Sequence, residues 1–162
     1  SYEQSIAGKT ASLLSTACRI GGLTGGLERH TVDQLTTFGH TYGMAFQIVD
    51  DILDVIASED QLGKPAGNDL IEGVYTLPVL LALESDVGEQ LHELLGKELS
   101  TDERDRALSL IRSTGAVEEA FTRAQFWAQK AKLELESLPS SPATNALSAA
   151  TNHLLDRAQS AS

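Results

Sequence analysis

The stretch Phe46–Val55, FQIVDDILDV, places Asp50, Asp51 and Asp54 among aliphatic residues that otherwise have the spacing of a helix core. In a helix that advances about 100° per residue, these aspartates fall within about 60° of Gln47, while aliphatic and aromatic side chains gather on the opposite side. The stretch therefore predicts an amphipathic helix with one acidic face and one apolar face, which favours an all-α fold.

Glycine and proline residues divide the rest of the chain into further helical segments, and no stretch shows sustained strand-type alternation. Thr76 is expected to be an N-cap, with Pro78 tolerated in the first turn. The predicted helices are Tyr2 to Ile20 (ending at Gly21-Gly22), Thr31 to Ala57, a helix from near Thr76, and residues 86–97, 101–114, 116–138 and 143–159, with a polar loop from Ser58 to Asn68. We expect a single all-α segment over residues 1–162.

The segment from Val117 to Leu138 has an ordinary amphipathic pattern, with apolar residues at three- and four-residue spacing. Trp127 belongs to this pattern, so we expect it in a core or an interface rather than at a ligand. The apolar positions are Val117, Ala120, Phe121, Ala124, Trp127, Ala128, Ala131 and Leu135.

Composition excludes several classes of function. The chain of 162 residues has a formal net charge of -11, which argues against nucleic-acid binding because acidic surfaces repel phosphate backbones. Cys18 is the only cysteine, so no intrachain disulfide can form and a reduced cytoplasmic setting is expected. No apolar run approaches the roughly 20 residues of a membrane span, so the sequence predicts a cytoplasmic protein that is not transmembrane.

The aspartates of the acidic face are close enough to repel one another. Asp50 and Asp54 are four residues apart and Asp51 and Asp54 are three apart, which brings the side chains within about 6 Å. Like charges at about 5 Å cost roughly 3 kcal/mol at an effective dielectric near 20. No lysine or arginine lies three or four residues away, and Gly43 leaves room one turn earlier for a second backbone or a ligand. The face is therefore either fully solvated or covered by a cation.

Carboxylates without a complete protein ligand set suit Mg²⁺, which keeps waters and shares itself with substrate phosphates. An EF-hand is the alternative metal site, but it needs ligands along a loop rather than in a helix. A phosphate site also needs fixed positive charge. Lys9, in a polar row with Ser5, Ser12 and Thr16, and Lys64, in a glycine-rich loop, are the candidates.

Three segments together resemble one family. FQIVDDILDV, followed by GKPAGNDLIEGVYTLPVLLAL at residues 63–83, resembles the second aspartate-rich motif of the trans-isoprenyl diphosphate synthases, the polyprenyl synthetase family. YEQSIAGKTASLL at residues 2–14 resembles the Lys-Thr helix of that family. Their order and spacing match the family from Tyr2 to Leu83, and the later segments are compatible with its C-terminal helices.

The resemblance implies a helical bundle of the isoprenoid synthase type and a Mg²⁺-dependent prenyltransferase. In that family an allylic diphosphate ionises, isopentenyl diphosphate adds head-to-tail to the allylic cation, and loss of a proton completes the cycle. By resemblance, the metal would be held by Asp50, Asp51 and Asp54, the allylic diphosphate by Lys9 and Lys64, and Thr10 and Gln47 would lie near the developing cation. Lys9, Thr10 and Gln47 are thus the candidate catalytic residues, and Gln47 is also a candidate for substrate binding.

Two departures from the family pattern matter. Val74 stands where many members carry a lysine. The first aspartate-rich motif and the isopentenyl diphosphate site precede the Lys-Thr helix in the family, so the resemblance implies that this chain is a C-terminal half. We therefore expect it to need the N-terminal half of the same enzyme, to be inactive alone, to form a homodimer when complete, and to leave Tyr42, Val49 and Leu53 as apolar surface without a partner.

The alternative is a non-catalytic companion subunit, or a helical interaction module, of a heteromeric prenyl synthase. Such subunits tend to lose the aspartates, whereas this chain keeps all three. A class I terpene cyclase is a further alternative, which would share the Mg²⁺ chemistry but not the GKPAGNDL and TLP segments.

Overall fold

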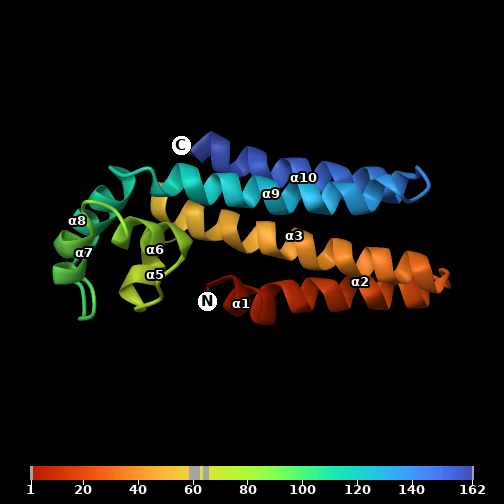
Figure 1. The fold of residues 1–162 in the computed structure, drawn as a ribbon, viewed down its shortest axis with the longest axis horizontal. Coiled ribbons are helices and arrows are strands. Elements are labelled where there is room, and N and C mark those ends of the chain that lie inside the picture. The colour runs from red at the N-terminus through yellow and green to blue at the C-terminus, as the bar shows by residue number, and fades with distance from the viewer. Residues whose placement is uncertain (1, 59–62, 64–65, 162) are drawn as a thin grey trace. The chain divides into compact units, whose positions relative to one another are not determined.

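The structure, a computed structural model, describes residues 2–58, 63 and 66–161. It confirms the all-α prediction, since no strand occurs in those ranges. The helices, labelled in Figure 1, are α1 (Tyr2–Ile6), the π-helical turn η1 (Ala7–Ala11), α2 (Ser12–Thr24), α3 (Arg29–Ile56), α5 (Asn68–Ile71), α6 (Leu77–Leu83), α7 (Gly88–Leu94), α8 (Thr101–Arg112), α9 (Ala116–Glu136) and α10 (Pro142–Ala161). None of these helices combines the length and the apolar character that crossing a membrane requires.

The end of the first predicted helix differs from the structure. The first helix passes through Gly22 and ends at Thr24, because Gly22 packs against the next helix: a Cβ there would lie 3.1 Å from Cγ2 of Val32. The chain turns instead at Gly26, whose φ of 70° suits glycine. The short helix α5 was not predicted, whereas Thr76 does occupy the N-cap of α6, although its hydroxyl makes no capping hydrogen bond.

The chain forms two compact units. The first unit comprises residues 1–49 and 123–157, and the second comprises residues 50–122 and 158–162. Helix α3 supplies the first unit up to Val49 and the second unit from Asp50, so the predicted site residues are divided between the units.

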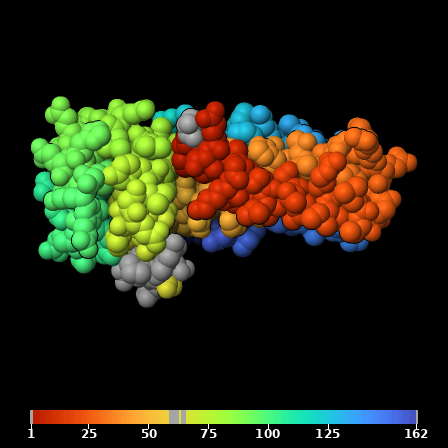
Figure 2. Space-filling model, turned by 90° about the horizontal axis from the view of Figure 1, so that it is seen from below, coloured from red at the N-terminus to blue at the C-terminus, as the bar shows by residue number. Residues whose placement is uncertain are grey.

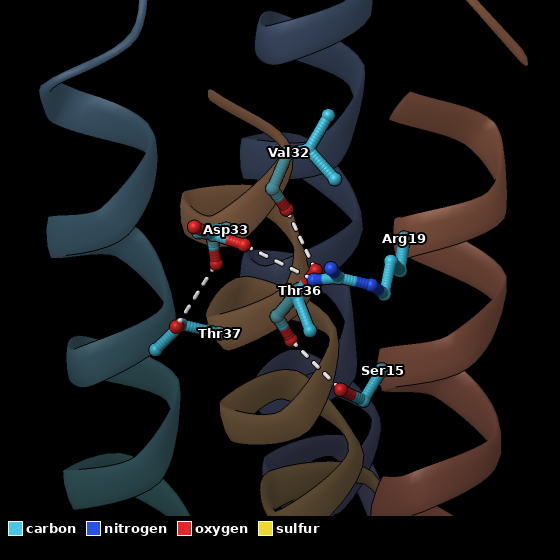
Figure 3. A network of polar contacts seen from close by, with 6 residues as sticks. All are labelled: Ser15, Arg19, Val32, Asp33, Thr36 and Thr37. Atoms are coloured by element: carbon cyan, nitrogen blue, oxygen red, sulfur yellow. Dashed lines mark hydrogen bonds and ion pairs between the residues drawn. The ribbon is translucent and has the colours of Figure 1, made fainter. Parts of the chain in front are cut away.

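In the first unit α2 lies alongside α3 (Figure 1), and glycine permits the close approach. A Cβ on Gly39 would lie 2.5 Å from the carbonyl oxygen of Leu14 and 2.8 Å from Sγ of Cys18. Polar contacts join the same two helices farther along (Figure 3): Ser15 Oγ donates to the Thr36 carbonyl at 3.1 Å. Cys18 is half-buried in this contact, and burial raises the pKa of its thiol.

Arg19 and Asp33 form an ion pair at 3.0 Å beside this interface, also drawn in Figure 3. Both side chains are about half exposed, so we assign the pair little stability. The interface therefore depends on close backbone packing more than on charge.

The predicted apolar stripe of α9 is buried along most of its length, which confirms the pattern from the sequence. Ala128 and Ala131 are fully buried, and Trp127 is half-buried in an edge-to-face contact with His40 at 6.3 Å between ring centroids. Trp127 is thus a packing residue, as expected. The first-unit cluster around this helix comprises Phe38, Ala131 and Leu135, with Cys18, Tyr42, Leu138 and Leu147 against it.

The second unit has its own core, in which α6 packs with α7 and α8. Its buried members are small and medium aliphatic residues, whose removal from water is the main stabilising contribution. They are Val55, Ala66, Leu70, Val79, Ala82, Leu91, Leu94, Leu95, Ala107, Leu108, Ile111 and Ala116.

Helix α8 begins with a capping box. Ser100 Oγ accepts from the Glu103 backbone N–H, and the Glu103 carboxylate accepts from the Ser100 backbone N–H. Lys97 also donates to the Glu103 carboxylate. The hydrogen bond from Lys97, followed by those from Ser100, lowers the pKa of Glu103 from its ordinary 4.5 to about 2.

A lowered folded-state pKa means that the contribution of Glu103 to stability is present above pH 4.5 and is lost as the pH falls through about 2. We expect an NMR titration to show the Glu103 carboxyl ionising well below 4.5. Lys97→Met should raise that pKa toward the ordinary value, whereas Lys130→Met should leave it unchanged. A wild-type value near 4.5, or equal values in both variants, would contradict the assignment.

Candidate functional site

The predicted site residues lie on two elements of the described chain. Lys9 and Thr10 belong to η1 and Gln47 belongs to α3, all within the first unit. Asp50, Asp51 and Asp54 continue α3 in the second unit. Lys64 lies outside the described residues, as do residues 59–62 and 65 of the predicted loop.

The structure brings Thr10 and Gln47 together. The Thr10 hydroxyl donates to Oε1 of Gln47 at 2.6 Å, a partly buried bond between residues that are 37 positions apart. Close approach of η1 to α3 allows this bond, because a Cβ on Gly43 would lie 2.7 Å from Cα of Ala11. The prediction that Gly43 makes room for a second backbone is therefore confirmed.

Lys9 projects from the same turn and is exposed. The expected polar row on one regular helix is altered here, because the π-helical turn changes the angular spacing between Ser5 and Ser12. π-helical turns occur frequently at functional sites. The turn presents the Lys9 ammonium to solvent and directs the neighbouring Thr10 hydroxyl to α3.

The aspartates differ in their exposure. Asp50 is exposed, whereas Asp51 and Asp54 are 3% and 4% exposed. The acidic face is thus not a fully solvated face, which rules out the simpler of the two explanations left open by the sequence. Buried carboxylates require hydrogen bonds or cations, and Asp54 Oδ2 accepts from the Asp69 backbone N–H at 3.2 Å.

The C-terminal end of α3 is held by backbone contacts within the second unit. The Asp54 carbonyl accepts from Gly67 N–H at 2.8 Å, and the Val55 carbonyl accepts from Nε of Arg112 at 2.7 Å. These bonds satisfy carbonyl groups that a helix end leaves open. They fix the last turn of the helix and, with it, the position of the Asp54 carboxylate.

The three aspartates offer oxygen donors but do not by themselves surround an ion. Across the ranges that the structure describes, no three acidic, histidine or cysteine side chains are placed to hold one ion between them. The oxygen donors themselves fit a hard cation, and two of the three carboxylates are removed from water. The chain therefore fits a divalent cation that completes its coordination with waters, phosphate oxygens or carboxylates from elsewhere.

The apolar surface expected on the opposite face of α3 is largely covered. Val49 is 0% exposed and Leu53 is 5% exposed, so the prediction for these two residues was wrong. Both side chains are buried within this chain itself, without another half. Tyr42 is half-buried, with its ring 5.7 Å from that of Phe38, and burial raises the pKa of its hydroxyl while Arg157 opposes the rise.

Sequence reasoning missed three residues that organise the site. Gly67, Asp69 and Arg112 make backbone or side-chain contacts to the last turn of α3 from distant positions. Asp69 acts through its backbone N–H and Gly67 through its left-handed conformation, with a φ of 72°. Gly67 itself was the only available signal in the sequence. A glycine indicates a turn, but it does not indicate which helix the turn contacts.

A cavity of about 340 Å³ lies in the second unit, and none of the candidate site residues lines it. Ile52 and Ile56 line it from α3, and its wall is mostly apolar. The other lining residues are Val117, Glu118, Phe121, Thr122, Ala158 and Gln159. The candidate site is therefore defined by its side chains and not by this cavity.

Comparison with known proteins agrees with the residue pattern. The family described as polyprenyl synthetase matches residues 1–111. Component 2 of the heptaprenyl diphosphate synthase of Geobacillus stearothermophilus is 40% identical over 146 residues, which are 90% of this chain and 46% of that protein. The nonaprenyl diphosphate synthase of Mycobacterium tuberculosis is 36% identical over 96% of this chain and 48% of its own length.

Solved structures show the same correspondence. Geranylgeranyl pyrophosphate synthase from Corynebacterium glutamicum, complexed with calcium and isoprenyl diphosphate, has a TM-score of 0.87 and 36% identity over 97% of this chain and 50% of its own. Heptaprenyl diphosphate synthase from Staphylococcus aureus has a TM-score of 0.88 and 31% identity over 96% and 49%. The chain thus spans about half the length of these relatives. With the family match, the identities and the shared fold in agreement, this chain belongs to the polyprenyl synthetase family.

Proposed function

We propose that residues 1–162 are the C-terminal half of a prenyl diphosphate synthase, which condenses an allylic diphosphate with isopentenyl diphosphate head-to-tail. The observation that carries this proposal is the burial of Asp51 and Asp54 beside exposed Asp50 on one helix. Carboxylates grouped on one helix face are oxygen ligands that suit a divalent cation, and the diphosphates of this reaction need the same cation. The names of the relatives agree with this chemistry.

The metal in this proposal is Mg²⁺, held by Asp50, Asp51 and Asp54. Bound there, it would offset the negative charge of the allylic diphosphate and of the diphosphate that leaves. The calcium in the Corynebacterium relative supports a divalent cation as the general kind of cofactor.

The residues of the first unit would act on the allylic substrate. Exposed Lys9, with Lys64, would bind the diphosphate that departs with the electron pair of the broken C–O bond. Thr10 and Gln47, fixed by their mutual hydrogen bond, would place their oxygen atoms near the allylic carbon as it becomes cationic. Isopentenyl diphosphate would then form the new C–C bond and lose a proton. The complete enzyme is expected to be a homodimer.

The test uses two proteins: the 162-residue chain and a chimera, in which this chain replaces the matching segment of the Mycobacterium relative, which is not named as a component of a larger synthase. We expect the chimera to convert an allylic primer and labelled isopentenyl diphosphate into a longer prenyl diphosphate in Mg²⁺. Chelation with EDTA should abolish the product. The chain alone should be inactive, because among its described residues no three ligand side chains meet around one ion. A folded but inactive chimera would refute the proposed activity, and turnover by the chain alone would refute the incomplete site.

A companion subunit without catalytic activity is the second candidate, because two relatives are named as component 2 of a heptaprenyl diphosphate synthase. Retention of all three aspartates favours the enzyme. A chimera that is inactive by itself, but forms product when another component of a synthase is added, would support the companion subunit.

The role of Lys9 has its own test in the chimera. Lys9→Gln removes the charge without shortening the side chain much, so we expect the KM for the allylic diphosphate to rise about tenfold. The KM for isopentenyl diphosphate should change much less. Lys132→Gln on α9 is the control and should change neither value. Equal changes in both KM values for Lys9→Gln would show that Lys9 does not distinguish the two substrates.

A further inference from the structure

The cavity of the second unit, which the candidate site does not use, is formed where the end of α3, the start of α9 and the end of α10 meet (Figure 1). We call it the α3–α9–α10 pocket. All of its lining residues belong to the second unit. Its volume of about 340 Å³ falls in the range of small-molecule sites, which begins at about 300 Å³. The pocket is therefore large enough for a small organic molecule.

The inner part of the pocket is apolar. Ile52 and Ala158 are 1% and 2% exposed and form its floor, while Ile56, Val117 and Phe121 are half-buried and form its walls. Ala158 leaves space there because its side chain is a single methyl group. Water in such a space finds few hydrogen-bond partners, so the inner part favours the hydrocarbon body of a ligand.

The polar residues of the lining lie at its rim. Glu118, Thr122 and Gln159 are all exposed. The Thr122 hydroxyl already donates to the Glu118 carbonyl at 3.0 Å, and Gln159 has a contact of its own within the chain. The Glu118 carboxylate makes no hydrogen bond or ion pair with any other residue that the structure describes. It is thus the polar group of the lining that remains for a ligand.

The position of Glu118 keeps its carboxylate negatively charged. Glu118 lies in the first turn of α9, where the helix dipole favours an anion. No lysine or arginine lies three or four residues away from it along the chain. An apolar pocket with one uncompensated carboxylate at its rim selects a ligand of positive charge.

A second hollow in the same unit shows no such selection. It has a volume of about 610 Å³, and its residues belong to the surface drawn in yellow-green and green in Figure 2. Its lining carries charges of both signs, which already have partners: Glu72 accepts from Asn68, and Lys97 donates to Glu103. This hollow therefore serves as an internal control.

We propose that the α3–α9–α10 pocket binds a small apolar molecule that carries one cationic amine. The hydrocarbon body lies against Ile52, Phe121 and Ala158, and the ammonium pairs with the Glu118 carboxylate. Such a ligand differs from the diphosphates of the proposed reaction, which Glu118 would repel. The inference does not depend on the proposed function, because it concerns a separate set of residues.

The test uses three probes with one hydrocarbon body and different head groups: phenylbutylamine, phenylbutanol and phenylbutyrate. Calorimetric titration measures their binding to the 162-residue chain and to the chimera. We expect the amine to bind both proteins with a dissociation constant of about 1 mM or tighter. The alcohol should bind about three- to fivefold more weakly, because it lacks the ion pair, and the carboxylate should bind more weakly still.

The location of the bound amine is read from the amide NMR signals of the chain. The signals of Thr122 and Ala158 should shift with the amine concentration and reach saturation. Leu99 lines the second hollow, and its signal should not shift. Shifts that do not saturate, or that include Leu99 to the same extent, would overturn the inference.

Three variants test the two parts of the pocket separately. Glu118→Gln should weaken the amine about three- to fivefold and leave the alcohol unchanged. Glu136→Gln makes the same change at an exposed position of the same helix and should alter neither affinity. Val117→Phe fills the pocket and should weaken the amine and the alcohol alike, by at least tenfold. Its circular dichroism spectrum shows whether the fold is retained.

Several outcomes would overturn the inference. Equal affinities for the three probes, or an unchanged amine affinity in Glu118→Gln, would exclude the ammonium contact even if Val117→Phe did not fold. Binding by the chain but not by the chimera would show that the rest of the enzyme fills the pocket. Binding is measured without turnover, so an inactive chimera that binds the amine would refute the proposed function alone.

Discussion

Asp50→Asn in the chimera should lower Mg²⁺-dependent turnover by about 10²- to 10³-fold while leaving the fold intact. Asp50 is the exposed member of the three aspartates, so its charge is not part of a packed core. Loss of one carboxylate ligand weakens the stabilisation of the leaving diphosphate, which is needed most in the transition state. Steady-state rates at saturating Mg²⁺ and both substrates measure the effect.

Two comparisons make this result specific. Asp86→Asn, at an exposed carboxylate between α6 and α7, should leave turnover unchanged. Asp54→Asn should lower turnover and also the free energy of unfolding, because Asp54 is buried and accepts from Asp69 N–H. Unaltered turnover in Asp50→Asn would remove this residue from the metal site, whatever Asp54→Asn does.

Gly39→Ala should destabilise the isolated chain by about 2 kcal/mol, because overpacking against a backbone forces the two helices apart. The added Cβ would lie 2.5 Å from the Leu14 carbonyl oxygen, which is not a flexible side-chain end. In the same chain Gly21→Ala should raise the free energy of unfolding by about 1 kcal/mol, the usual gain of alanine over glycine in a helix. Gly21 lies within α2 and has open space around its Cβ position.

The two variants form a matched pair, since the chemical change is identical and both sites are helical. Urea unfolding followed by circular dichroism gives the difference of about 3 kcal/mol that we expect from the two effects. If both substitutions stabilised the chain, α2 and α3 would not approach as closely as the structure shows. If both destabilised it to the same extent, the contact at Gly39 would not be the cause.

The sequence alone could identify much of the candidate site, because its residues cluster within short segments. Asp50, Asp51 and Asp54 share one helical turn and a half, so their common face follows from helix geometry. Thr10 and Gln47 were named only through the family resemblance. Their hydrogen bond depends on how η1 approaches α3, which no local pattern encodes.

The covered surface of α3 shows the same limit. Val49 and Leu53 were expected to lie open in an incomplete enzyme, but they are buried in this chain. Helical periodicity indicates which side of a helix is apolar but does not indicate which element covers it. By the same reasoning, the exposure of Leu13, Ile20 and Leu23 on α2 could not be predicted from the sequence, since both sides of that helix carry apolar residues.

By itself, the sequence determined the all-α class, the aspartate-bearing helix and the family, because helix periodicity, turn residues and motif spacing act over a few neighbouring positions. Only the tertiary structure decided that Asp51 and Asp54 are buried while Asp50 is exposed. It also decided that Gly39 and Gly43 are contacts between helices, and that Leu13, Ile20 and Leu23 of α2 are exposed. These properties depend on packing between residues that are distant in sequence, where burial is shared among several elements and no single segment specifies it.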